Sequence, residues 1–118
     1  YCTWLTTISL PENLTSLGKN AFYNCTALKS IIIPKNVLVI KENTFNYCRN
    51  LEDITIDRNI KKIEKYAFGN CLDIENLYYS GTSEEWDEID IDQTWDLVDY
   101  SGYHTINKET KIIFNNQQ

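Results

Sequence analysis

The sequence predicts a β-rich α/β solenoid, with about three to four 23-residue rungs that each contribute parallel strands and short helical turns. Two observations predict this fold. Cysteines and apolar residues recur with a fixed 23-residue period, and the recurrence stops after Tyr79. A fixed period of about 20–29 residues is typical of solenoids, in which each rung buries its apolar face against its neighbours. We therefore assign residues 1–79 to the repeats and residues 80–118 to a C-terminal capping segment.

The repeat consists of apolar columns that keep step without an insertion. Its cysteine column is Cys2, Cys25, Cys48 and Cys71, and its phenylalanine column is Phe22, Phe45 and Phe68. Five further columns hold aliphatic residues, and they begin at Leu5, Ile8, Leu10, Leu14 and Leu17. Because no single rung can bury these side chains alone, we expect like residues to lie over like in one continuous core.

Each part of a rung has a physical role. Ile31 and Ile33 occupy alternate positions, so in a strand both point to the same, buried face. Pro34 follows and ends the strand, because proline has no N–H to donate to the ladder. Asn36 comes next, in a position where its side chain can bond its own backbone and favour a turn. The phenylalanine that closes each frame is expected on a short helical turn, with its ring in the core.

The capping segment predicts a short helix and a final strand. Thr82 and Glu85 have the spacing of a capping box, in which each side chain bonds the other residue's backbone N–H. The helix that follows would place Trp86 and Ile89 on the open end of the stack. The apolar run at residues 112–114 predicts the last strand.

Composition limits the possible partners. The 118 residues carry a net charge of −6, which argues against nucleic acid, since phosphate binding needs clustered Lys and Arg. No run of about 18 apolar residues is present, so we expect no membrane insertion. The charge is uneven, because residues 1–70 carry nine basic and six acidic side chains and residues 71–118 carry two basic and eleven acidic ones. The absence of Met predicts a piece of a longer protein.

The four cysteines allow three interpretations. Zinc sites use closely spaced pairs, and the 23-residue period provides none. Neighbouring rungs would bring their Cα atoms to about 5 Å, so disulfides are geometrically possible. We favour buried free thiols, packed as small apolar residues in one column.

The capping segment contains the other candidates for a chemical site. Its acidic residues could bind calcium, but Trp95 occupies the position at which a calcium loop needs glycine. We favour a solvated, charged face, formed by Glu84, Glu85, Asp87, Glu88, Asp90, Asp92, Asp96 and Asp99. His104, the only histidine, has no nucleophile or carboxylate beside it in sequence, and we expect it to be solvated or packed in the cap. The sequence therefore predicts no enzyme, no catalytic residue, no metal and no cofactor.

The pattern resembles the BspA-like class of leucine-rich repeat. The resemblance rests on Cys25, Leu28, Ile31, Ile33 and Pro34, followed by Asn36, Val37, Ile40 and Phe45, and it covers residues 2–79. It implies a secreted or cell-surface protein that binds a protein partner such as a host matrix or surface protein. We therefore expect an adhesion or interaction module. The alternative is an architectural role, in which this segment closes a longer solenoid whose binding surface lies upstream.

The binding surface is expected on the outward positions of the strands, which vary while the inward columns are fixed. Two outward rows are predicted on the first strand of each rung, namely Thr7, Ser30, Asp53 and Asn76, and Ser9, Ile32, Thr55 and Tyr78. Ile32 and Tyr78 are the apolar anchors. Leu38 and Val39 are expected to face outward on the second strand. A small basic group is formed by Arg58, Lys61, Lys62 and Lys65.

Overall fold

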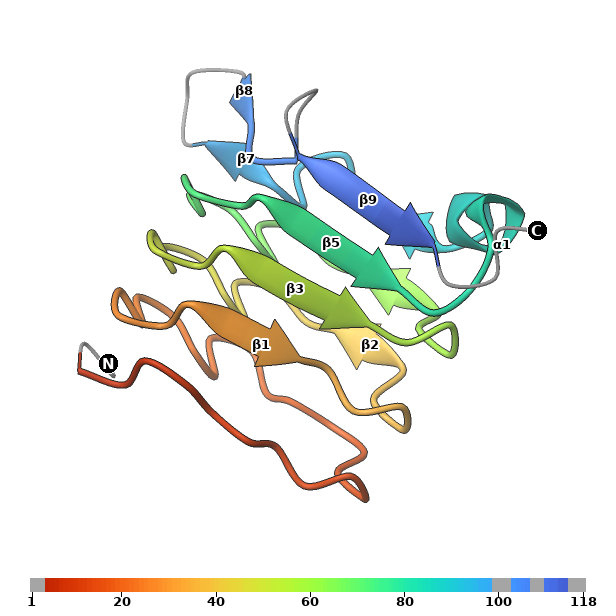
Figure 1. The fold of residues 1–118 in the computed structure, drawn as a ribbon, viewed down its shortest axis with the longest axis horizontal. Coiled ribbons are helices and arrows are strands. Elements are labelled where there is room, and N and C mark those ends of the chain that lie inside the picture. Colours follow the sequence, from red (N-terminus) through yellow and green to blue (C-terminus); the bar gives the residue numbers. More distant parts are fainter. Residues whose placement is uncertain (1–3, 99–102, 107–109, 115–118) are drawn as a thin grey trace.

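The solenoid is confirmed in a computed structural model, which describes residues 4–98, 103–106 and 110–114. Its main sheet has four parallel strands in the order β1 (Ser30–Ile32), β3 (Asp53–Ile56), β5 (Asn76–Tyr79) and β9 (Lys111–Phe114). A second parallel sheet contains β2 (Val39–Ile40), β4 (Lys62–Ile63) and β6 (Asp90–Ile91). Figure 1 shows the strands of the main sheet side by side, with β2 behind them.

The strands pair in the register that the repeat period predicts. Ile31 lies beside Ile54, which lies beside Leu77. Val39 and Lys62 form the equivalent pair in the second sheet. The first rung lacks a strand in the described residues and joins the main sheet through a bridge between Thr7 and Ser30 and a hydrogen bond from the Lys29 N–H to the Thr6 carbonyl at 3.0 Å. Equal rung length therefore fixes the register among β1, β3 and β5 and between β2 and β4.

The core lies between the two sheets and the turns that connect them. Inward residues of β1, β3 and β5 are fully buried or nearly so, and so are those of β2 and β4. The phenylalanine column is a single file of rings. Phe22 and Phe45 have ring centroids 5.3 Å apart, and Phe45 and Phe68 have centroids 5.0 Å apart, with planes within 7° and 5° of parallel. Like residues thus lie over like, as predicted.

The phenylalanines lie on consecutive β-turns and not on the helical turns that were expected. Residues with positive φ interrupt any helix at two equivalent positions in each rung, which are Asn20, Asn43 and Tyr66, and Asn24, Tyr47 and Asn70. Asparagine adopts this left-handed conformation more readily than other non-glycine residues. A tyrosine held there costs on the order of 1 kcal/mol. The turns of neighbouring rungs are bonded to each other, as by the Phe45 N–H to the Ala67 carbonyl at 2.8 Å.

The cysteine column contains both free and bonded residues. Cys25 is disulfide-bonded, so free thiols were the wrong expectation for this residue. The spacing of neighbouring rungs, about 5 Å, lies within the Cα separation that a disulfide spans. Cys48 and Cys71 are free and fully buried. Their Sγ atoms donate to the Phe22 and Phe45 carbonyls of the preceding rung, both at 3.2 Å, so each thiol also serves as a hydrogen-bond donor.

The predicted capping box and helix are confirmed. Helix α1 (Ser83–Asp87) begins after Thr82, whose Oγ1 accepts from the Glu85 N–H while the Glu85 carboxylate accepts from the Thr82 N–H. Both oxygens of the Glu85 carboxylate also accept from Arg58 Nη2, at 3.0 and 2.9 Å. The Trp86 ring packs edge-on against Tyr79, with centroids 5.1 Å apart. Helix α1 is thereby fixed against the third rung.

Residues 80–98 form a rung that is longer than the others. This rung adds β6 to the second sheet and continues the column of turns. Ile91 pairs with Ile63 and so departs from the repeat period, because helix α1 replaces the short turn found in the other rungs. The Phe68 N–H donates to the Trp95 carbonyl at 2.7 Å, in the position that Ala67 has beside Phe45. Asp96 therefore follows Phe68 in the phenylalanine column. The boundary after Tyr79 between repeats and cap stays a prediction.

Asp96 is buried, and this corrects the expectation that it belongs to a solvated acidic face. Its carboxylate accepts from the Ile106 N–H at 2.9 Å and lies 2.6 Å from His104 Nδ1. His104 is itself exposed on β8 (Tyr103–His104), which pairs antiparallel with β7 (Leu97–Val98). The carboxylate thus joins the end of the phenylalanine column to this short hairpin. Asp99, another member of the predicted acidic face, lies outside the described residues.

Candidate binding surface

The outward side of the main sheet brings six of the predicted surface residues together. One row runs across neighbouring strands through Ser30, Asp53 and Asn76, and the next runs through Ile32, Thr55 and Tyr78. Within the first row the Asn76 amide donates to the Asp53 carboxylate at 2.9 Å. Thr7 extends this row to the first rung through its bridge to Ser30.

Strand β9 adds one residue to each row. Lys111 lies beside Asn76, and Ile113 lies beside Tyr78. The sequence predicted this strand but not its register, because Leu77 pairs with Ile112 across an insertion to which the repeat period no longer applies. The period alone could not have found Lys111 and Ile113. Only the alternation of inward and outward positions within a strand could have indicated that Lys111 and Ile113 face outward.

The second row forms an exposed apolar stripe, which we define as Ile32, Thr55, Tyr78 and Ile113. The exposed fraction is 66% for Ile32, 38% for Tyr78 and 37% for Ile113. No described segment covers this side of the sheet (Figure 1). The outward face of a sheet in a solenoid is ordinarily open to solvent, so the feature that needs explanation is the apolar character of the stripe and not the open face.

A groove of about 250 Å³ lies at one end of the stripe. Ile32 and Thr55 contribute to its wall together with Pro34, and the acidic residues Glu12 and Asp57 lie at its rim. This volume is below that of most small-molecule sites, which are about 300–1,000 Å³. The groove therefore fits a single side chain better than a complete cofactor.

Leu38 and Val39 do not join this surface. They belong to the second sheet, where Leu38 is exposed and Val39 is half-buried. The structure thus separates Leu38 and Val39 from the six predicted residues on β1, β3 and β5.

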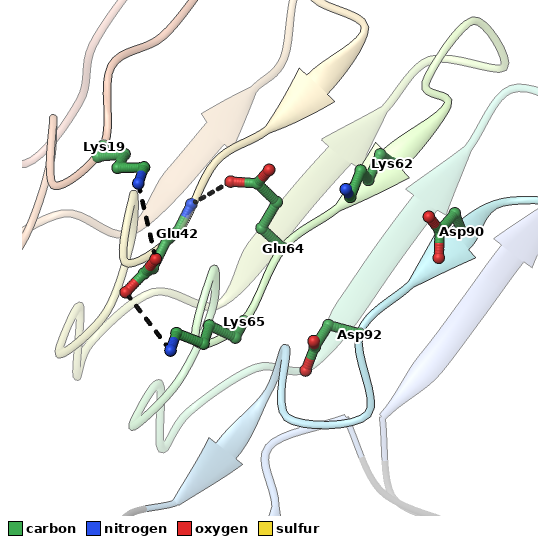
Figure 2. Close-up of a pocket in the computed structure, with 7 residues that line it drawn as sticks. All are labelled: Lys19, Glu42, Lys62, Glu64, Lys65, Asp90 and Asp92. Carbon is green, nitrogen blue, oxygen red and sulfur yellow. Dashed lines mark hydrogen bonds and ion pairs between the residues drawn. The ribbon is translucent and has the colours of Figure 1, made fainter.

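The basic group is also divided. Arg58 is engaged by Glu85, and the hydrogen bond between them raises the pKa of the guanidinium. Lys62 and Lys65 line a second hollow, of about 440 Å³, together with Lys19 and the carboxylates of Glu42, Glu64, Asp90 and Asp92 (Figure 2).

Opposite charges alternate across this second hollow. Glu42 lies 3.8 Å from Lys19 Nζ and 3.9 Å from Lys65 Nζ, so one carboxylate joins lysines from two rungs (Figure 2). Asp92 bonds the Thr94 hydroxyl and N–H, and these two bonds lower the pKa of its carboxyl group. The lysines that line the hollow thus face carboxylates and do not make the purely basic patch that would favour phosphate binding.

Within the described residues, no group of three or more His, Cys, Asp or Glu side chains is arranged to hold a metal ion. No helix in the same part of the chain has the length and apolar character needed to cross a membrane.

The comparisons with known proteins agree with the geometry. The family model described as a BspA type leucine rich repeat region matches residues 1–116 in six copies. A solved structure of a leucine-rich cell surface protein from Faecalibacterium prausnitzii A2-165 is 36% identical and superimposes with a TM-score of 0.74. The match covers 78% of this chain and 24% of that chain. A search of curated proteins finds no match. The chain belongs to the BspA-type leucine-rich repeat family.

Proposed function

We propose that this chain is an extracellular or cell-surface module that binds a protein partner through the outward face of its main sheet. The observation that carries the proposal is the exposed apolar stripe on a parallel sheet. Ile32, Tyr78 and Ile113 stand in register with Thr55 over a fully buried core. A partner that covered the stripe would remove apolar surface from water without requiring the scaffold to reorganise.

The size and chemistry of the face support a protein as the partner. The molecule measures 38 by 34 Å across its two longest axes, which gives room for the roughly 800 Å² that a standard interface buries on each side. Apolar anchors are bordered by a polar row with Asp53, Asn76 and Lys111, and this arrangement is the one that interfaces use. The neighbouring groove would receive one side chain of the partner. A host matrix or surface protein is the partner class we propose.

The proposal is tested by surface plasmon resonance with purified extracellular-matrix proteins over the immobilised chain. The informative variant carries Ile32→Ser and Tyr78→Ser, since both side chains are exposed and their replacement leaves the core intact. The matched control is Leu72→Ser, which removes an apolar side chain that is 58% exposed but lies outside the main sheet. Binding that is lost in the first variant and kept in the second supports the proposal. Equal binding by all three proteins contradicts it.

An architectural role is the second candidate, and Asp96 favours it. The phenylalanine column ends at this buried carboxylate, whose bonds to residues 104 and 106 place a hairpin at the end of the stack. In this role the segment closes a longer solenoid. Matrix binding by a longer chain, together with no binding by this segment alone, would favour closure over recognition.

A further inference from the structure

A second candidate site lies between two neighbouring turns, away from the main sheet. The turns at residues 42–47 and 65–70 enclose a groove of about 320 Å³. They are bonded in parallel, by the Asn43 N–H to the Lys65 carbonyl at 3.2 Å and by the Tyr47 N–H to the Gly69 carbonyl at 2.9 Å. Equivalent residues of the two rungs therefore face each other across the groove. We call this site the turn groove.

The residue types at the turn groove are unexpected for their backbone conformation. Six non-glycine residues of the described chain have positive φ, and four of them are asparagine, which tolerates this conformation. The two exceptions are Tyr47, with φ 66°, and Tyr66, with φ 55°. Both exceptions line the turn groove. Bulky residues in the left-handed region are outliers that persist where the surrounding structure or a function requires them. The two strained tyrosines thus lie at the same groove.

A chain of amides forms the buried part of the turn groove. Asn70 Nδ2 donates to Asn46 Oδ1 at 2.9 Å, and Asn46 Nδ2 donates to Asn43 Oδ1 at 3.1 Å. Asn46 and Asn70 are more than nine-tenths buried. Gly69 makes room for this chain, because a Cβ there would lie 2.9 Å from Asn46 Oδ1. Asn46 and Asn43 are each oriented by these bonds, and among the described residues the Nδ2 of the half-buried Asn43 has no hydrogen-bond acceptor.

The described lining of the turn groove includes two charged side chains and no aliphatic side chain. Glu42 and Lys65 lie at its rim, 3.9 Å apart, and add a carboxylate acceptor and an ammonium donor. None of the described residues that line it is aliphatic. A peptide partner would require an apolar pocket for its anchoring side chain, and the turn groove offers none.

We propose that the turn groove is a saccharide-binding site. A sugar ring presents C–H groups on its faces, which pack on aromatic rings, and hydroxyls at its edge, each of which is donor and acceptor at once. Tyr66 supplies one ring, and Tyr47 supplies a second, whose contacts include the Tyr23 ring at 5.8 Å and the Arg49 guanidinium at 5.5 Å. The amide chain and Glu42 supply the paired donors and acceptors. The volume lies at the lower end of small-ligand sites, so one sugar unit at a time would be bound. This site is independent of the proposed protein-binding face.

The probes are glucose, galactose, mannose and N-acetylglucosamine, added separately to the ¹⁵N-labelled chain and followed by two-dimensional NMR. We expect saturable shifts at millimolar concentration for at least one sugar, centred on the amides of Asn43, Tyr47, Tyr66 and Asn70. A polyproline peptide serves as the competing ligand class. The proposal is overturned if no sugar gives saturable shifts at these amides, or if the peptide binds there more tightly than every sugar.

One variant separates binding from folding. Tyr66→Asn places at position 66 the residue type that the equivalent Asn20 and Asn43 already have. We expect sugar affinity to fall by about tenfold, while the melting temperature stays unchanged or rises by up to roughly 5 °C. Tyr103→Asn, at an exposed ring on β8, is the matched control and should bind as the unchanged chain does. Unaltered sugar affinity in Tyr66→Asn, or a lower melting temperature, would show that the ring is structural.

Discussion

Phe45 and Phe68 stack with ring centroids 5.0 Å apart and planes within 5° of parallel, and both rings are fully buried. Phe45 has a second stacking partner in Phe22, so it lies in the middle of the file. Its ring therefore loses more contacts on truncation than a ring at either end. This position makes it the most direct probe of the packing between rungs.

Replacement of the Phe45 ring is expected to destabilise the fold severely. Phe45→Ala should lower the free energy of unfolding by about 3–5 kcal/mol, because it removes a buried ring and leaves a cavity between two rungs. Urea denaturation followed by circular dichroism measures the change. Lys41→Ala in the same rung should be nearly silent, since the Lys41 ammonium lies at the surface, where it bonds Ser16. Similar losses in both variants would contradict the assignment of the columns.

The buried thiols predict a loss of stability in alkali. Burial raises the pKa of Cys48 from 9.0 to about 12 and raises that of Cys71 well above its ordinary value. The folded state keeps these protons while the unfolded state releases them. The stabilisation is therefore complete below pH 9 and is lost as the pH rises toward 12, by about 1.4 kcal/mol per pH unit for each thiol.

The variant Cys48→Ala isolates this effect. The slope of unfolding free energy against pH, over the alkaline range above the ordinary thiol pKa, should be less steep in the variant by the contribution of one thiol. Urea titrations at several pH values measure both slopes, and their difference cancels the titration of lysines and tyrosines common to both proteins. Parallel slopes would show that the Cys48 thiol is not protected by burial.

The capping box predicts that loss of the Thr82 hydroxyl lowers the stability of the fold modestly. Thr82→Ala should cost about 0.5–2 kcal/mol, because the Glu85 N–H loses its acceptor at the start of α1. Thr82→Ser keeps the hydroxyl and should restore most of the stability. Thermal unfolding of the three proteins measures the effect. An equal loss with serine would assign the contribution to the methyl group and not to the cap.

The Asp96 carboxylate predicts local loosening at the end of the stack. Asp96→Ala removes the acceptor of the Ile106 N–H and the group beside His104, and it should cost about 1–3 kcal/mol. Hydrogen exchange should accelerate in the segments at 97–98 and 103–106 more than in β3. Asp87→Ala, at an exposed carboxylate, is the control expected to leave exchange unchanged. Uniform acceleration across the chain would indicate global unfolding and contradict a local role.

The sequence predicted the fold wherever the period applied. Equal spacing is sufficient to place Ile31 beside Ile54 and Phe22 beside Phe45, because rungs of equal length must pair in register. The same spacing placed six of the predicted surface residues, those on β1, β3 and β5, on one face. Turn type was less predictable, since the left-handed residues Tyr47 and Tyr66 are not the residue types that ordinarily mark such turns.

The capping segment was less predictable because its contacts no longer follow the period. Helix α1 makes the fourth rung longer than the others, which conceals the equivalence of Asp96 with Phe68. Asp96 resembles the exposed acidic residues around it in sequence, and only its hydrogen bonds distinguish it. The Cys25 disulfide was equally hidden, because a column of identical residues permits both thiols and bridges.

The proposed role of the exposed apolar stripe can be measured by hydroxyl-radical footprinting of this chain in complex with a bound matrix protein. Oxidation of Ile32, Tyr78 and Ile113 should fall in the complex, while oxidation of Leu72 and Tyr103, which are exposed elsewhere, should stay the same. Protection of Leu72 or Tyr103 with an unprotected stripe would place the binding surface elsewhere and contradict this role.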